Sequence, residues 1–162
     1  MKRGFFSRFF TDDHLEAGVS IPSTLSGPPT ESGLDAATME GILADIDLDT
    51  AIASHDNWKL RLQNFLDGNS SEILKPEILC MDNRCDLGQW LHGSGKQRLG
   101  HYPAFQILIS RHKNFHVQAS TVVALAQSGN TEKARHAMDA PYRHASSQVV
   151  LLLRQLKRGL QY

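Results

Sequence analysis

Cysteine is scarce in this sequence, with two residues in 162, and this excludes a secreted scaffold held by several disulfides. An excess of one charge is also missing. The 17 Lys and Arg residues balance 17 Asp and Glu residues, so the chain lacks the basic footprint of a nucleic-acid-binding protein. The longest apolar run, at 149–153, is far shorter than the roughly 20 residues of a membrane-spanning helix. These absences favour one soluble domain with a core that needs no crosslinks.

The balanced total conceals an uneven distribution of charge. Residues 1–10 carry three bases and no acid, residues 11–50 carry nine acids and no Lys or Arg, and residues 51–162 carry fourteen bases against eight acids. Two interpretations of the acidic stretch stay open. It is either a solvated segment or a complement to the basic end of the folded body or of a partner.

The first 36 residues have the composition of a tail and linker. Residues 17–36 are rich in Gly, Ser, Thr and Pro without a sustained apolar period, which predicts flexibility. Residues 1–10 place four Phe among three bases, which is typical either of a weak membrane-surface or partner-docking segment or of an unstructured terminus. They lack the continuous apolar core of a signal peptide. We therefore predict a flexible tail over 1–36 and a folded body over 37–162.

Helical periodicity dominates the predicted body, and strand signals are absent from it. Apolar positions recur at intervals of three, four and seven residues in three segments, about 37–66, 103–128 and 131–156. The stripes are Leu48, Ile52, His55, Leu62 and Leu66; Phe105, Ile109, His112, His116, Ala119, Val123 and Ala126; and Ala134, Met138, Ala145, Val149, Leu152 and Leu156. Thr131 is the predicted cap of the third helix, and Pro141 is expected to kink it.

Residues 69–100 interrupt this periodicity with one Pro and four Gly residues. They predict a long irregular connection that carries a short helix near 87–91. The expected fold is therefore all-α, a small antiparallel four-helix bundle in which this connection joins long helices.

Three histidines fall on the core-facing stripes, where an unsatisfied polar ring is costly. His112 and His116 are four residues apart, so they project from one helix face on successive turns, the spacing with which a helix chelates a metal ion. His55 lies on a separate stripe. Each ring is alternatively a hydrogen-bonded core residue, but a shared metal ion would satisfy all three at once.

Cys85 supplies a thiolate that would complete the ligand set. It lies at the beginning of the predicted short helix, where backbone dipoles and Arg84 are expected to lower its pKa. Three imidazoles and one thiolate suit tetrahedral zinc. Four protein ligands leave no open position for an activated water, and no Glu lies beside the His pair as in HExxH, so we expect no enzymatic activity.

The remaining candidates are assigned lesser roles. Cys80 is either an ordinary buried thiol or the residue that resolves an oxidised Cys85 into a disulfide. The histidines expected at the surface or at helix ends are His14, His92, His101, His136 and His144.

Over about residues 45–158 the sequence resembles the chemoreceptor zinc-binding domain family, usually written CZB. The resemblance rests on His55 followed by Trp58, on Cys85-x-Leu87-Gly88-x-Trp90 followed by Gly93 and Lys96, and on His112-x-x-x-His116. The chain departs from the family at Gln89, Leu91 and His92, where members often have Lys and then two aromatic residues.

The resemblance implies a helical bundle that holds one Zn²⁺ through His55, Cys85, His112 and His116. Such domains are regulatory modules of bacterial cytoplasmic chemoreceptors and diguanylate cyclases, sense zinc or oxidants such as hypochlorous acid, and commonly form homodimers. This sequence contains neither a methyl-accepting coiled coil nor a cyclase domain. We therefore expect a stand-alone, cytoplasmic form that acts on such a protein in trans. The alternative is a non-sensing adaptor bundle with purely structural zinc or no metal.

Overall fold

The computed structural model describes residues 34–161, which are mostly helical and contain no strand. The all-α prediction is confirmed. The Phe-rich segment 1–10, His14 and the predicted linker up to residue 33 lie outside the described residues. Leu34, the first described residue, is buried. The carboxylate of the next residue, Asp35, accepts a hydrogen bond from the Thr38 amide at 2.8 Å and caps the first helix.

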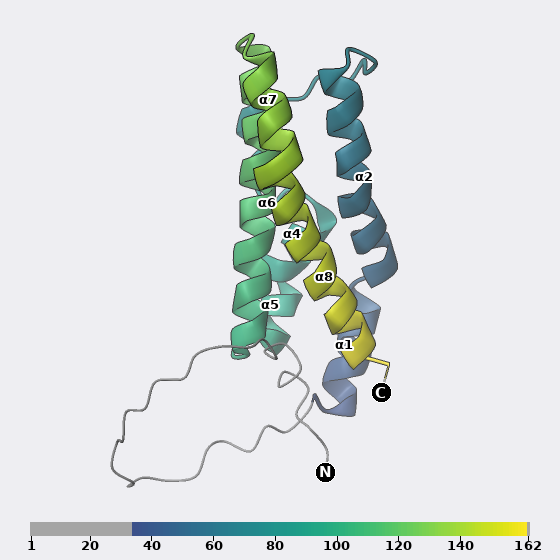
Figure 1. Ribbon diagram of the computed structural model, residues 1–162. Coiled ribbons are helices and arrows are strands. Elements are labelled where there is room, and N and C mark those ends of the chain that lie inside the picture. Colours follow the sequence, from purple (N-terminus) through teal and green to yellow (C-terminus); the bar gives the residue numbers. More distant parts are fainter. Residues whose placement is uncertain (1–33, 162) are drawn as a thin grey trace, which may run out of the picture.

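Long helices form three legs of the bundle. They are α2 (Leu48–Leu66), α6 (Pro103–Gln127) and a continuous rod made of α7 (Thr131–Ala137), the π-helical turn η2 (Met138–Tyr142) and α8 (Arg143–Gly159). In Figure 1, α2 and α6 rise in the same direction and the rod returns antiparallel to both. The segment between α2 and α6 descends beside α6, so the chain follows the up-down-up-down path of the predicted bundle with this connection as its second leg.

The connection contains more helix than the sequence predicted. Besides the expected short helix, now α4 (Asp86–His92), it forms α3 (Pro76–Leu79) and α5 (Ser94–Leu99). Gly88 and Gly95 lie inside α4 and α5, whereas Gly93 and Gly100 are the residues at which these two helices end. Gly93 separates α4 from α5 with φ −103° and ψ −116°.

The prediction of one helix over about 37–66 is wrong. The chain forms α1 (Ala36–Asp45) and α2, separated at Ile46, whose backbone is extended. A second helix begins here because the Asp47 carboxylate accepts hydrogen bonds from the amides of Asp49 and Thr50 and so caps α2. Thr131 is likewise not a cap but the first residue of α7, and the N-cap position belongs to Asn130.

The predicted distortion at Pro141 is present as the π-helical turn η2. Proline lacks the amide that an α-helix requires, and a wider turn accommodates it without ending the rod. The first and last residues of this turn, Met138 and Tyr142, remain buried in the core.

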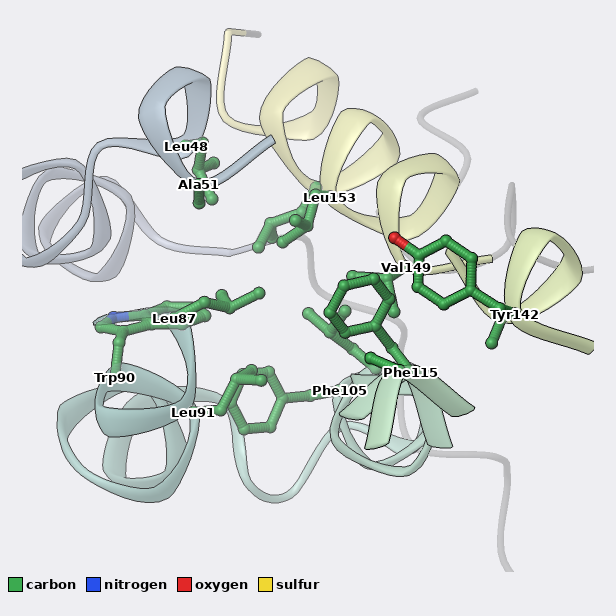
Figure 2. Packing of buried hydrophobic residues seen from close by; sticks show 14 of the residues in the cluster. Leu48, Ala51, Leu87, Trp90, Leu91, Phe105, Phe115, Tyr142, Val149 and Leu153 are labelled. Carbon is green, nitrogen blue, oxygen red and sulfur yellow. The ribbon is translucent and has the colours of Figure 1, made fainter. Parts of the chain in front are cut away.

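The core fills the space between the four legs. In Figure 2, Trp90 and Leu91 from α4 approach Phe105 from α6, while Phe115, Tyr142, Val149 and Leu153 close the opposite side. Most residues of the predicted stripes are buried, and the exceptions, Ile52, Leu66, Ile109, Ala126 and Leu152, are half-buried. The stripes therefore identify the core-facing sides correctly.

Side chains of α6 hold the connection against the bundle. Ser120 Oγ donates a hydrogen bond to the Pro76 carbonyl at 3.0 Å, and Gln127 Nε2 donates to the Leu74 carbonyl at 2.7 Å. The Pro76 carbonyl also accepts the Cys80 amide at 3.0 Å, and Leu74 lies two residues before α3, so the two side-chain bonds tie the segment around α3 to α6. They fix the start of the connection relative to α6.

The described acids of the stretch make local contacts with the folded body. Asp35 and Asp47 cap helices, whereas Asp45 pairs with Arg98 at 3.0 Å and Asp49 pairs with Lys157. Such exposed pairs each contribute at most about 1 kcal/mol. Within the described part of the chain, none of the helices has the length and hydropathy needed to cross a membrane.

Candidate metal centre

Two imidazoles face each other on the buried side of α6. His112 and His116 are separated by one helical turn, and their Nε2 atoms lie 3.2 Å apart. His116 Nδ1 donates to the Leu79 carbonyl at 2.8 Å. Because a carbonyl oxygen only accepts, this bond places the proton on Nδ1 and leaves the lone pair on Nε2.

Cys85 reaches the same point from the connection. It occupies the N-cap position of α4, as predicted, and its Sγ accepts a hydrogen bond from the Gly88 amide at 3.3 Å. Sγ lies 3.2 Å from His112 Nε2 and 3.5 Å from His116 Nε2. The thiol is half-buried, whereas the three histidines are buried.

His55 approaches from α2. Its Nδ1 donates to the Ala51 carbonyl one turn earlier at 2.7 Å, which leaves Nε2 free to point into the cluster. The His55 ring packs on Phe115, with ring centroids 4.9 Å apart. One ligand atom from each of the four residues lies within 4.8 Å of every other.

Three of the four donor atoms have the spacing of a tetrahedral zinc site, and the fourth, from His55, lies within 4.8 Å of them. Bond lengths of about 2.0–2.1 Å to nitrogen and 2.3 Å to sulfur require ligand atoms roughly 3.3–3.6 Å apart at tetrahedral angles. The observed separations of 3.2, 3.2 and 3.5 Å among Cys85, His112 and His116 are close to those values. The structure thus brings together all four residues that the sequence proposed as ligands.

Burial sets the protonation of the histidines. It lowers the pKa of His55, His112 and His116, and for His112, where His116 and His55 add to the effect of burial, the pKa falls to about 2. The imidazoles are therefore neutral near pH 7, the form in which nitrogen binds a metal.

The expected lowering of the Cys85 pKa is wrong for the metal-free protein. Burial raises the pKa of this thiol, and the negative charges of Asp86 and Asp82 raise it further. The Gly88 amide lowers it, as a helix N-terminus should, but does not offset burial. A bound cation would supply the missing positive charge, since coordinating thiols are deprotonated.

The residues assigned lesser roles lie outside the cluster. His92, His101, His136 and His144 are exposed, as predicted. Cys80 is also exposed, so the interpretation as a buried thiol is wrong; it is the C-cap residue of α3, a helix without a buried residue.

The sequence did not reveal the groups that lie next to the second ring nitrogens of the histidines. The contact of His55 with the Ala51 carbonyl could have been predicted from the sequence, since Ala51 lies four residues before His55 in the same helix. The Leu79 carbonyl and the carboxylate of Asp82, 3.9 Å from His112 Nδ1, belong to the irregular connection. No periodicity or spacing signal marks them.

Comparison with known proteins agrees with this geometry. The family model described as the chemoreceptor zinc-binding domain matches residues 55–123, a span that contains all four residues of the cluster. No curated protein and no solved structure matches the chain significantly. The family and the donor set together identify the cofactor as one zinc ion. Residues 55–123, which carry the four-residue cluster, therefore match the chemoreceptor zinc-binding domain family, a family of zinc-binding signalling domains.

Proposed function

We propose that this protein is a zinc-dependent regulatory module in which His55, Cys85, His112 and His116 hold one Zn²⁺. The observation that carries the proposal is the convergence of four ligand atoms within 4.8 Å from α2, the connection and α6. Four ligands close the coordination sphere of zinc, as in structural and regulatory sites, so the site has a binding role and not a catalytic one.

The chain's own residues prepare the site for the ion. His55 and His116 donate Nδ1–H to backbone carbonyls and thereby hold Nε2 toward the centre. The Gly88 amide holds Cys85 Sγ beside them. Bound zinc would join the connection to two long helices and keep Cys85 as a thiolate. Loss of one ligand should then loosen the contact of the connection with α2 and α6.

We propose that the signal is either a change in free zinc or an oxidant of the hypochlorite class. Cys85 is the only member of the cluster that is not fully buried, so a small oxidant can reach it. The thiolate sulfur attacks the chlorine of HOCl, and hydrolysis of the S–Cl bond gives Cys–SOH, with chloride as the other net product. The sulfenic acid is a weaker metal ligand, so zinc is released.

We further propose that the protein is cytoplasmic, forms a homodimer, and acts in trans on a chemoreceptor or a diguanylate cyclase. The family description supports a chemoreceptor connection. Sedimentation analysis with and without a chelator would test the dimer, and a monomer in both states would contradict it. Zinc-dependent capture of a purified receptor or cyclase would test the partner.

Metal analysis of untagged protein tests the site itself. We expect one zinc per chain, and we expect the His112→Ala/His116→Ala variant to lose it. The His136→Ala/His144→Ala variant removes two exposed histidines from the following helices and should keep the ion. Absence of metal in the wild type would favour the adaptor alternative.

Zinc release by hypochlorite tests the proposal that the protein senses an oxidant through Cys85. Wild-type protein loaded with zinc should release the ion when hypochlorite is added, as measured with a zinc-sensitive dye. Cys85→Ser, loaded at saturating zinc, should not respond, whereas Cys80→Ser should respond like wild type in this first step. Release that persists in Cys85→Ser would refute oxidant sensing through this thiolate. A zinc dissociation constant far below any plausible concentration of free zinc would refute zinc sensing, because the site would then stay occupied.

A further inference from the structure

The three histidines of the cluster differ in how their second ring nitrogen is satisfied. His55 Nδ1 donates to the Ala51 carbonyl, and His116 Nδ1 donates to the Leu79 carbonyl. His112 is completely buried, and its Nδ1 has no hydrogen-bond partner among the described residues. Histidines that bind metals almost always donate the other ring N–H to a carboxylate, a carbonyl or water, because this fixes the tautomer and the ring orientation. His112 Nδ1–H is therefore the one ring N–H of the cluster without an acceptor among the described residues.

The carboxylate of Asp82 lies close to this unsatisfied atom. Asp82 Oδ2 is 3.9 Å from His112 Nδ1, which is too long for a hydrogen bond but requires an approach of only about 1 Å to make one. The same oxygen lies 2.8 Å from Nε2 of the exposed His92. A carboxylate has about four acceptor positions, so it can serve both rings. Asp82 therefore stands between a buried ligand and the surface.

The loop that carries Asp82 is held close to the cluster. The Asp82 backbone carbonyl lies within contact of Cys85 Sγ, at 3.9 Å. It also packs directly over Gly88, where an added Cβ would lie 1.7 Å from that carbonyl oxygen. The Asp82 side chain is 16% exposed, so water shields it only partly from a charge in the cluster. Asp82 is thus placed to respond to a cation at the site.

We propose that Asp82 is the positioning residue for His112, accepting its Nδ1–H when zinc is bound and linking the buried ligand to His92 at the surface. This rests on the proposed function, since it assumes that His112 binds the ion through Nε2. Coordination draws electron density from the imidazole and makes Nδ1–H a stronger donor, which favours a charged acceptor. The backbone carbonyls that serve His55 and His116 are replaced here by a side chain on a loop that also holds Cys85.

The test is the zinc affinity of Asp82→Ala, measured by competition with a chelator of known affinity. Loss of the outer acceptor should weaken binding about 10- to 100-fold. Asp82→Asn retains an acceptor oxygen and the side-chain shape, and we expect an affinity between those of the alanine variant and the wild type. Asp86→Asn is the matched control. It removes the same charge beside Cys85 but is exposed at the first turn of α4, and its affinity should remain near the wild-type value.

A spectroscopic measurement separates positioning from general loss of structure. In zinc-loaded protein, the Nδ1–H proton of His112 should give a downfield NMR resonance protected from exchange with water. This resonance should disappear in Asp82→Ala while that of His116, bonded to the Leu79 carbonyl, stays. Equal zinc affinities of Asp82→Ala and Asp86→Asn, or an unchanged His112 resonance, would overturn the inference while leaving the zinc site intact. A wild-type protein that binds no zinc would instead overturn the proposed function.

Discussion

At the residue scale, Gly88 has the strictest steric requirement around the metal centre. A Cβ at this position would lie 1.7 Å from the Asp82 carbonyl oxygen and 2.8 Å from its carbon. Both are backbone atoms, which cannot rotate away as a side chain does. A side chain at position 88 would therefore push away the loop that precedes Cys85.

We predict that Gly88→Ala weakens zinc binding about tenfold or more, the scale expected when the support of a ligand is lost. A chelator-competition titration measures the effect. The control is Gly68→Asn, because Gly68 has φ +73° with open space around its Cα, and asparagine tolerates this conformation. An affinity of Gly88→Ala equal to that of the control would show that the loop adjusts without moving Cys85.

At the element scale, the junction between α1 and α2 depends on one cap. Asp47 accepts hydrogen bonds from the Asp49 amide at 2.9 Å and from the Thr50 amide at 3.1 Å. This cap positions the start of α2, and the same helix carries His55 two turns later.

We predict that Asp47→Ala lowers the free energy of unfolding by about 1 kcal/mol, the usual cost of losing an N-cap. Urea unfolding monitored by circular dichroism measures the change. Asp56→Ala is a control on the same helix, since Asp56 makes an exposed pair with Arg154 at 3.2 Å that should contribute less. Equal losses in the two variants would mean that the cap is not the main role of Asp47.

At the scale of the whole molecule, zinc and folding are coupled because the ligands come from separate segments of the chain. We predict that chelation lowers the melting temperature. At a free zinc concentration 100 times the dissociation constant, the ion would stabilise the fold by about 2.7 kcal/mol. For a domain of this size this corresponds to a shift of roughly 5–10 °C, which scanning calorimetry would detect. The His112→Ala/His116→Ala variant should show no zinc-dependent shift; a shift of wild-type size would place the stabilising ion elsewhere.

The buried histidines also predict how the stability of metal-free protein depends on pH. Burial lowers the pKa of His55, His112 and His116 in the folded state, whereas in the unfolded chain histidine titrates near 6.5. Below about pH 6.5 the unfolded state therefore binds more protons than the folded state, and stability falls as pH falls.

Each such histidine contributes a slope of up to about 1.4 kcal/mol per pH unit in this window. Denaturant unfolding of chelated protein between pH 7.5 and 5 measures the total slope. A stability that is constant or rises toward pH 5 would contradict the buried, neutral state of the three rings.

The helical class, the core-facing stripes and the four candidate ligands can be predicted from the sequence without the folded structure. Periodicity requires only local geometry, so the burial of His55, His112 and His116 followed from their places on apolar stripes. The pair on α6 followed from the helical repeat, and Cys85 from its position before a short helix. The Asp47 cap went unrecognised because the apolar repeat continues on both sides of it, although an Asp at that position is itself a cap signal.

The groups that lie beside these ligands are known only from the folded chain. The Leu79 carbonyl and Asp82 reach the cluster because the connection descends beside α6, and no local rule specifies that path. The sequence predicts a lowered pKa for Cys85, whereas the folded chain raises it, for the same reason. A helix N-terminus lowers a thiol pKa locally, but burial in the assembled bundle raises it more. Helical patterns depend on neighbours in sequence, whereas desolvation and the outer contacts of a metal centre depend on segments that meet only after folding.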